Sequence, residues 1–173
     1  MKDRVINLLS WLGASAVLAG LDQYTKGLAV RHLKGQEPFV LLPGIFELHY
    51  SENRGAAFGM LQGRQGFFFV IGILVLAAAG YVMVRMPSYR CARYHFLKLC
   101  TMMITAGAVG NMVDRISQGY VVDFLYFRLI DFPIFNVADI YVTTATGLLL
   151  VLFLFYYKDE DFEIFRLGNR KGE

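Results

Sequence analysis

The sequence predicts a membrane protein that is mainly α-helical, with four transmembrane helices and a small β-hairpin or sheet outside the cytoplasm. Of its 173 residues, 56% are hydrophobic and only 18% are charged, which is too apolar for a soluble domain of this size. Four apolar stretches also approach or exceed the roughly 20 residues of helix that cross a bilayer. The length allows one domain, so we expect residues 1–173 to form a single membrane domain.

The predicted spans cover residues 6–28, 67–85, 96–116 and 138–157. The first follows a basic start and could be a cleaved signal peptide, but apolar sequence resumes after Lys26, which favours a retained span. Residues 36–60 form the predicted β region outside the cytoplasm. Within it, Phe39–Tyr50 has a strand-like composition interrupted by a Pro43–Gly44 turn.

Basic residues predict the orientation, because cytoplasmic loops of membrane proteins are enriched in Lys and Arg. They are denser at both ends of the chain and between the second and third spans, namely at Lys2, Arg4, Arg85, Arg90, Arg93, Lys98, Lys158, Arg166, Arg170 and Lys171. We therefore expect both termini in the cytoplasm. The polar residues of four separate segments then gather at the outer membrane edge.

Two aspartates at this edge have unusually apolar neighbours. Asp123 lies in Val-Val-Asp-Phe and Asp139 in Phe-Asn-Val-Ala-Asp-Ile. Burial favours the protonated form of a carboxyl group, and two adjacent carboxyl groups share a proton, as an acid–base hydrolase requires. A single aspartate in such a place would more simply mark a helix end. Two in this setting favour catalysis.

Further polar residues are placed to support this pair. Asp22 and Lys26 are spaced i, i+4 and can pair on one helix face. Asn111, Asp114 and Arg115 form one polar face of the third span, where unpaired polar groups are costly. We expect Arg115 to pair with Asp114. Asn53 belongs either to a substrate-facing loop or to a helix start rich in small residues. Asn136 either binds substrate or orients an aspartate, or it only caps a helix. The sequence leaves both choices open.

Several other classes of protein are disfavoured. The net charge is only +3 and the basic residues are scattered, so nucleic-acid binding has no support. Cys91 and Cys100 lack metal-ligand spacing and the three histidines lie far apart, so we expect no metal, no cofactor and no required disulfide. A proton-coupled transporter would show repeats or polar groups near the bilayer midplane. A scaffold leaves the aspartate pair unexplained, and a Ser–Lys protease would have to use Ser51 or Ser117.

Five motifs in order resemble those of the bacterial lipoprotein signal peptidases, the aspartic-type signal peptidase II family. They are Asp22-Gln-Tyr-Thr-Lys26, Asn53-Arg-Gly-Ala-Ala-Phe58, Gly110-Asn-Met-Val-Asp-Arg115, Val121-Val-Asp-Phe124 and Phe135-Asn-Val-Ala-Asp139. The resemblance covers nearly the whole chain. One departure is an interval between Asp123 and Asp139 that is shorter than in some relatives.

The resemblance implies an intramembrane aspartic endopeptidase that cleaves prolipoproteins before their diacylglyceryl-modified cysteine. It implies that Asp123 and Asp139 are the catalytic pair, without a metal. Asp114 is a rival catalytic residue, but a structural ion pair suits it better. The expected partners are prolipoproteins, membrane lipid and the inhibitor globomycin. The expected form is a monomer in the bacterial cytoplasmic membrane, with its site near the outer face. The residues expected to bind substrate or support the site are Asp22, Lys26, Asn53, Arg54, Gly110, Asn111, Asp114, Arg115, Asn136 and Ala138.

Overall fold

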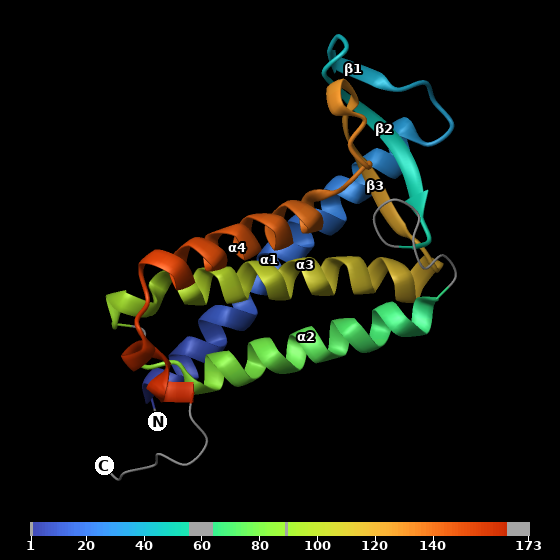
Figure 1. The fold of residues 1–173 in the computed structure, drawn as a ribbon. Coiled ribbons are helices and arrows are strands. Elements are labelled where there is room, and N and C mark those ends of the chain that lie inside the picture. Colours follow the sequence, from blue (N-terminus) through green and yellow to red (C-terminus); the bar gives the residue numbers. More distant parts are fainter. Residues whose placement is uncertain (1, 56–63, 89, 166–173) are drawn as a thin grey trace.

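Four long helices and one three-stranded sheet make up the computed structural model, which describes residues 2–55, 64–88 and 90–165 (Figure 1). The helices are α1 (Lys2–Leu33), α2 (Gln65–Arg85), α3 (His95–Gln118) and α4 (Val137–Phe155). The strands are β1 (Phe39–Leu42), β2 (Phe46–Asn53) and β3 (Val121–Phe127). Short 3-10 helices are η2 (Ala92–Tyr94), η3 (Arg128–Ile130) and η4 (Asp159–Phe165).

All four long helices are apolar and long enough to cross a membrane. The predicted fold class is therefore confirmed. Helix α1 is longer than its predicted span, because its 32 residues continue past the apolar stretch to Leu33. At 1.5 Å per residue it measures about 48 Å, against about 30 Å for the hydrocarbon core of a bilayer. The helix can therefore extend beyond the bilayer and carry the start of the sheet region.

Helix α3 lies at the centre of the bundle and packs against each of the other three helices. Gly107 makes the contact with α4 close. A Cβ atom there would lie 2.7 Å from the carbonyl oxygen of Ala138 and 2.6 Å from a methyl group of Val142. Small residues allow such close approach of membrane helices, and this contact holds the start of α4 against α3.

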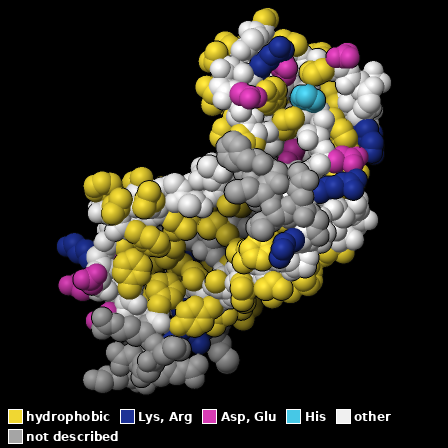
Figure 2. Space-filling view, turned by 45° about the vertical axis from the view of Figure 1, so that its right-hand side comes forward, with side chains coloured by type: hydrophobic (Ala, Val, Ile, Leu, Met, Phe, Trp, Pro, Cys, Tyr) yellow, Lys and Arg dark blue, Asp and Glu magenta, His cyan; other side chains and the backbone are white. Residues whose placement is uncertain are grey.

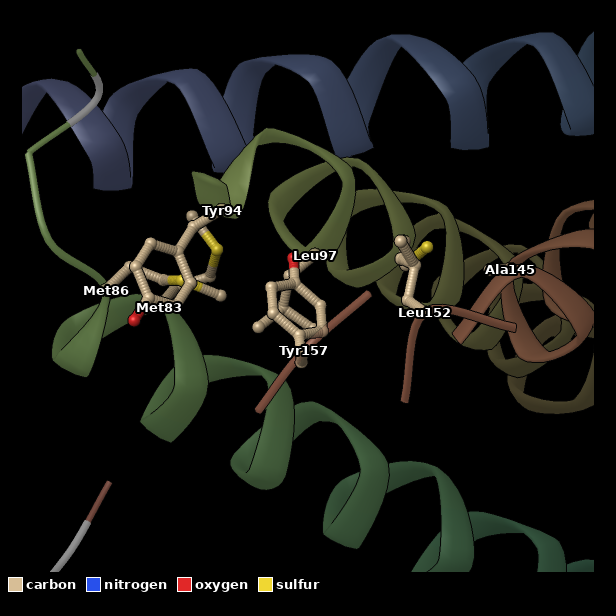
Figure 3. Packing of buried hydrophobic residues seen from close by; sticks show 8 residues of the cluster. Met83, Met86, Tyr94, Leu97, Ala145, Leu152 and Tyr157 are labelled. Carbon is tan, nitrogen blue, oxygen red and sulfur yellow. The ribbon is translucent and has the colours of Figure 1, made fainter. Parts of the chain in front are cut away.

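Apolar side chains fill the end of the bundle where α1 begins. Met83 and Met86 lie beside Tyr94, and Leu97 lies beside Tyr157 (Figure 3). The cluster is nearly inaccessible, since the side chains of both methionines are at most 2% exposed. Dispersion and burial of apolar surface stabilise this packing.

Polar contacts complete the same end. The buried Lys98 ammonium donates to Asn7 Oδ1 and to the backbone oxygens of Pro87 and Ser88, which satisfies its three N–H groups. Helix η4 is held there by an ion pair of 2.6 Å between Arg93 and Asp161. This end is therefore closed by packed side chains.

The sheet lies at the opposite end of the bundle, and its strands run across the ends of the helices (Figure 1). It is antiparallel in the order β1-β2-β3. Figure 2 shows hydrophobic side chains over much of the helical part and several charged side chains around the sheet. Strand β3 was not expected from the sequence.

Strand pairing brings distant residues together beside Asp123. Ser51 of β2 lies opposite Asp123, and Asn53 lies opposite Val121. After η3 the chain returns along β3, where Phe135 exchanges backbone hydrogen bonds of 2.9 and 3.0 Å with Leu125. That return places the start of α4, and with it Asp139, next to Asp123.

Candidate active site

A buried ammonium group lies where the bundle meets the sheet. Lys26 Nζ is 2.8 Å from Asp22 Oδ2, 3.1 Å from Asp114 Oδ2 and 2.9 Å from Asn111 Oδ1. The pairing of Asp22 with Lys26 expected from their i, i+4 spacing is confirmed. The three charged side chains are at most 4% exposed. Buried charges of this kind are stable only when they are paired and hydrogen-bonded.

Each of the two carboxylates also holds the backbone next to a candidate catalytic residue. Asp22 Oδ1 accepts a hydrogen bond of 2.8 Å from the backbone N–H of Ala138, the residue before Asp139. Asp114 Oδ2 accepts one of 3.1 Å from the backbone N–H of Val122, the residue before Asp123. One ion cluster therefore positions both candidate catalytic residues.

Gly110 and Ala138 leave room for this cluster. A Cβ atom on Gly110 would collide with the Asp22 carboxylate, so α1 can approach α3 at this level only beside a glycine. Ala138 is fully buried at the same level, and its Cβ lies close to Gly110. The structure thus places both residues in contact with the Asp22 carboxylate.

Gln23 belongs to the cluster, although the sequence analysis did not single it out. Its Nε2 donates to Asp114 Oδ1 at 2.9 Å and to the backbone oxygen of Gly110 at 3.0 Å. The sequence feature that could have indicated Gln23 is its i, i+3 spacing from Lys26, which places both residues on one side of α1.

Asn111 connects the ammonium group to Asp139. Its Oδ1 accepts from Lys26, which can only donate, so its Nδ2 must point the other way. Nδ2 donates to Asp139 Oδ1 at 2.9 Å. Lys26 therefore fixes the direction in which the amide faces the carboxyl group.

Asn136 contacts both aspartates. Its side chain accepts from the backbone N–H of Asp139 at 3.0 Å, and Asp139 Oδ2 accepts from the backbone N–H of Asn136 at 3.1 Å, which forms a capping box at the start of α4. Its Nδ2 donates to Asp123 Oδ1 at 2.6 Å. Of the two roles left open by the sequence, the structure places Asn136 in both, as a helix cap and as a partner of the aspartates.

Asp123 is 2% exposed on β3. Burial raises the pKa of Asp123 to about 7, and the negative charge of Asp139 adds to this effect. Hydrogen bonds from Asn53 Nδ2, at 2.9 Å, and from Asn136 act in the opposite direction. This carboxyl group can therefore gain or lose a proton near neutral pH.

A cavity of about 580 Å³ lies in front of these residues. It is bounded by α2, by α4 and by the chain that follows η3, and Asp139 lies on its wall. The lining residues are Asn53, Gly55, Phe68, Arg115, Phe132, Pro133, Ile134, Phe135, Asp139, Ile140, Thr143 and Thr144. Most of the lining is apolar, so the cavity offers a ligand mainly hydrophobic contacts with a few polar groups.

Arg115 lines this cavity. The prediction that it forms an ion pair with Asp114 is wrong. Asp114 instead pairs with Lys26, on the far side of Asn111. The Arg115 guanidinium donates to the backbone oxygens of Gly55 at 3.3 Å and Asn111 at 3.4 Å, and it lies 4.5 Å from the ring centre of Phe68. Among the described residues, no carboxylate lies within 4.0 Å of Arg115 and its Nε has no hydrogen-bond partner.

Arg54 stands apart from the cluster. Its guanidinium is exposed, lies 3.4 Å from Glu52 and sits over the ring of Tyr120. The remainder of the motif that begins at Asn53, from residue 56 to 58, lies outside the described residues. Asp131 is exposed and accepts a hydrogen bond of 2.6 Å from the Tyr126 hydroxyl group.

Fold and site together define a multi-pass membrane protein in which two carboxyl groups share an asparagine beside a cavity. A profile of the family described as Signal peptidase (SPase) II matches residues 14–155. The lipoprotein signal peptidase of Streptococcus thermophilus (strain CNRZ 1066) is 39% identical over 86% of this chain and 92% of its own length. That of Brevibacillus brevis (strain 47) is 41% identical over 79% of this chain and 89% of its own length.

Solved structures agree with these relatives. One described as a bacterial membrane enzyme covers 95% of this chain and 93% of its own, with a TM-score of 0.75 and 30% identity. A second with the same description has a TM-score of 0.73 and 31% identity, and covers 86% of this chain and 94% of its own. The chain belongs to the signal peptidase II family.

Replacing Lys26 by Met tests the ion cluster. The change leaves Asp22 and Asp114 buried without their cation, which typically costs about 3 to 5 kcal/mol. We expect a clear fall in the melting temperature of the purified protein in detergent. Lys34→Met is the matched control, because Lys34 pairs with Glu52 on the exposed surface, where ion pairs contribute little. Equal melting temperatures for the two variants would contradict the assigned role of Lys26.

The pKa of Asp123 predicts a pH dependence of stability. Asp123 binds its proton more tightly in the folded chain, with a pKa of about 7, than at its ordinary value of 3.8. Its stabilisation of the folded state is therefore complete below the ordinary pKa and is lost as the pH rises toward 7. The free energy of unfolding falls by up to about 1.4 kcal/mol per pH unit in this range. We expect Asp123→Asn to reduce the fall in melting temperature between pH 5 and pH 7, whereas Asp131→Asn should leave it unchanged.

Proposed function

We propose that this protein is an aspartic endopeptidase that removes the signal peptides of prolipoproteins, cleaving before the diacylglyceryl-modified cysteine. The observation that carries the proposal is the pair of carboxyl groups held by Asn136, one of them on the wall of a mostly apolar cavity. Membership of the signal peptidase II family supports it.

In the proposed reaction, Asp123 and Asp139 act on one water molecule. One carboxylate takes a proton from the water as its oxygen attacks the scissile carbonyl carbon, and the other carboxyl group donates a proton to the carbonyl oxygen. Collapse of the resulting intermediate breaks the C–N bond: the leaving nitrogen takes up a proton from one carboxyl group, and the other carboxylate takes a proton from a hydroxyl group of the intermediate, which restores the singly protonated pair. A pKa of about 7 for Asp123 suits a group that must both accept and donate at neutral pH.

The surrounding residues supply position rather than protons. Asn53, Asn111 and Asn136 donate to the two carboxyl groups without adding charge. The ion cluster of Lys26 with Asp22 and Asp114 holds the backbone N–H groups next to the two aspartates. Arg115 lines the cavity, and among the described residues its buried Nε–H has no hydrogen-bond partner. In the proposal, its guanidinium binds carbonyl oxygens of the substrate. Arg54 is exposed and would meet only the part of a substrate that lies in water.

The cavity suits a lipidated peptide. Its apolar lining can accommodate hydrocarbon, while Asn53, Arg115 and Asp139 line the part of the cavity nearest the sheet. The cyclic peptide globomycin is proposed to occupy the same cavity. We also propose that the protein acts as a monomer. A transporter is less consistent with the structure, because packed side chains close the other end of the bundle.

We also propose an orientation in the bacterial cytoplasmic membrane. The start of α1 and η4 lie at one end of the bundle and the sheet at the other (Figure 1). The excess of basic residues near the start of α1 and η4 supports a cytoplasmic location for that end. The two aspartates then lie near the outer face, where water is available.

Asparagine variants test the catalytic pair. Asp123→Asn and Asp139→Asn keep the size of the side chain but remove its ability to exchange a proton. We expect each to lower the turnover of a lipidated prolipoprotein by several orders of magnitude in detergent. The double variant should be little worse than either single one, because residues acting as a unit are strongly non-additive.

Asp131→Asn is the internal control for this experiment. Asp131 lies between the two residues in the sequence, but it is exposed and bonded to Tyr126. The variant should keep normal activity. An inactive Asp131→Asn protein together with an active Asp123→Asn or Asp139→Asn protein would refute the assignment.

Reporter fusions test the orientation. A reporter that is active only in the cytoplasm should be active when fused after Arg90 or at the C-terminus. It should be inactive when fused near Ile45, in the turn between β1 and β2. A cytoplasmic signal at Ile45 would overturn the proposed topology.

A further inference from the structure

Two hydroxyl groups lie on the cavity wall deeper in the bundle than Asp139. Thr143 and Thr144 belong to α4 and line the cavity together with Ile140 and Phe68. Thr143 is four residues after Asp139, so both lie on the same face of the helix about 6 Å apart along its axis. Of the polar side chains that line the cavity, these two lie furthest along α4 from the sheet.

Neither hydroxyl group has a hydrogen-bond partner among the residues that the structure describes. Two threonines of α3 are instead satisfied by their own helix. Thr101 donates to the Leu97 carbonyl oxygen and Thr105 to that of Thr101, each at 2.8 Å. Thr143 and Thr144 are exposed toward the cavity instead. Their oxygens can accept, and their O–H groups donate, to a molecule bound there.

A peptide substrate has unsatisfied backbone groups at this place. A protease must bind the residues around the cleaved bond unwound from their helix, and unwinding frees backbone N–H and C=O groups. In an apolar environment each free group costs several kcal/mol unless the protein supplies a partner. Under the proposed function, the signal-peptide side of the cleaved bond would run from the aspartates back into the membrane, where Thr143 and Thr144 line the cavity.

We propose that Thr143 and Thr144 bind the unwound backbone of the signal peptide just before the cleaved bond. This inference rests on the proposed function. An extended chain rises about 3.3 Å per residue, so 6 Å correspond to about two residues. Thr143 therefore meets the backbone about two residues before the cleaved bond, and Thr144 lies at the same wall. The threonines make recognition of this segment depend on its backbone.

Valine substitutions test the proposal, because valine replaces the hydroxyl group by a methyl group of similar shape. Kinetics are measured with a purified lipidated prolipoprotein in detergent. Loss of one neutral hydrogen bond should raise KM about 3- to 10-fold in Thr143→Val and Thr144→Val, with a smaller effect on kcat. Thr143→Ser and Thr144→Ser, which keep the hydroxyl group, should restore KM. The melting temperatures should equal that of the unmodified protein.

Thr146→Val is the matched control. Thr146 is also exposed on α4, but it does not line the cavity. Its variant should have unchanged kinetics. Normal kinetics in both Thr143→Val and Thr144→Val would overturn the proposal and leave the hydroxyl groups with a role within their own helix. Equal defects in the valine and serine variants would also overturn it, because the hydroxyl group would then be irrelevant.

A change in the substrate makes the test specific for the backbone. A precursor carrying an ester in place of the amide two residues before the cleaved bond lacks one N–H group. If Thr143 binds the backbone there, the ester should weaken binding to the unmodified enzyme more than to Thr143→Val. Equal losses in both enzymes would refute the contact. Failure of the unmodified enzyme to cleave the ordinary precursor would instead refute the proposed function itself, so the two outcomes are separable.

Discussion

The buried ammonium group of Lys26 is the interaction on which the remaining structure depends. A charge in a membrane bundle is tolerated only when opposite charges and hydrogen bonds replace water. Asp22 and Asp114 meet this need, and each carboxylate also accepts a backbone hydrogen bond. Asp22 binds the N–H group of Ala138 through its second oxygen, and Asp114 binds the N–H group of Val122 through the same oxygen that faces Lys26. Ala138 and Val122 adjoin the two candidate catalytic aspartates. A requirement of charge balance thus determines the place of two backbone segments.

Amide side chains position the two aspartates themselves through hydrogen bonds. Asn111 has its oxygen turned toward Lys26, so its NH₂ group faces Asp139. Asn136 holds the other side, with its NH₂ group on Asp123 and its backbone N–H on Asp139. Amides can do this without changing the net charge, whereas a further cation would hold both carboxyl groups ionised. The arrangement keeps a proton available to the pair.

The division of the molecule into two ends explains where the chemistry is placed. At one end, Met83, Tyr94 and Leu97 exclude water, and Lys98 is satisfied entirely by neutral oxygen atoms. At the other, α1 continues beyond its apolar part and the sheet covers the ends of the helices. The aspartates lie at the boundary between the apolar helices and the sheet. A substrate whose lipid remains in the bilayer could meet water there.

Local features of the site were determined by the sequence itself. The apolar runs predict the helices because only a helix satisfies its own backbone in lipid. The i, i+4 spacing of Asp22 and Lys26 predicts their pairing, since helical periodicity alone puts them on one face. The ordered motifs also indicated the family to which the chain belongs.

Only the tertiary structure decided the contacts between distant segments. The sequence favoured Arg115 as the partner of Asp114 because the two are adjacent, yet Lys26, 88 positions away in α1, occupies that place once α1 packs on α3. Asn53 reaches Asp123 through the register of β2 and β3, and the sequence did not predict β3. Gln23 and the two threonines acquired their significance in the same way. Periodicity specifies which residues share a face of one element, but the packing of whole helices decides which faces meet.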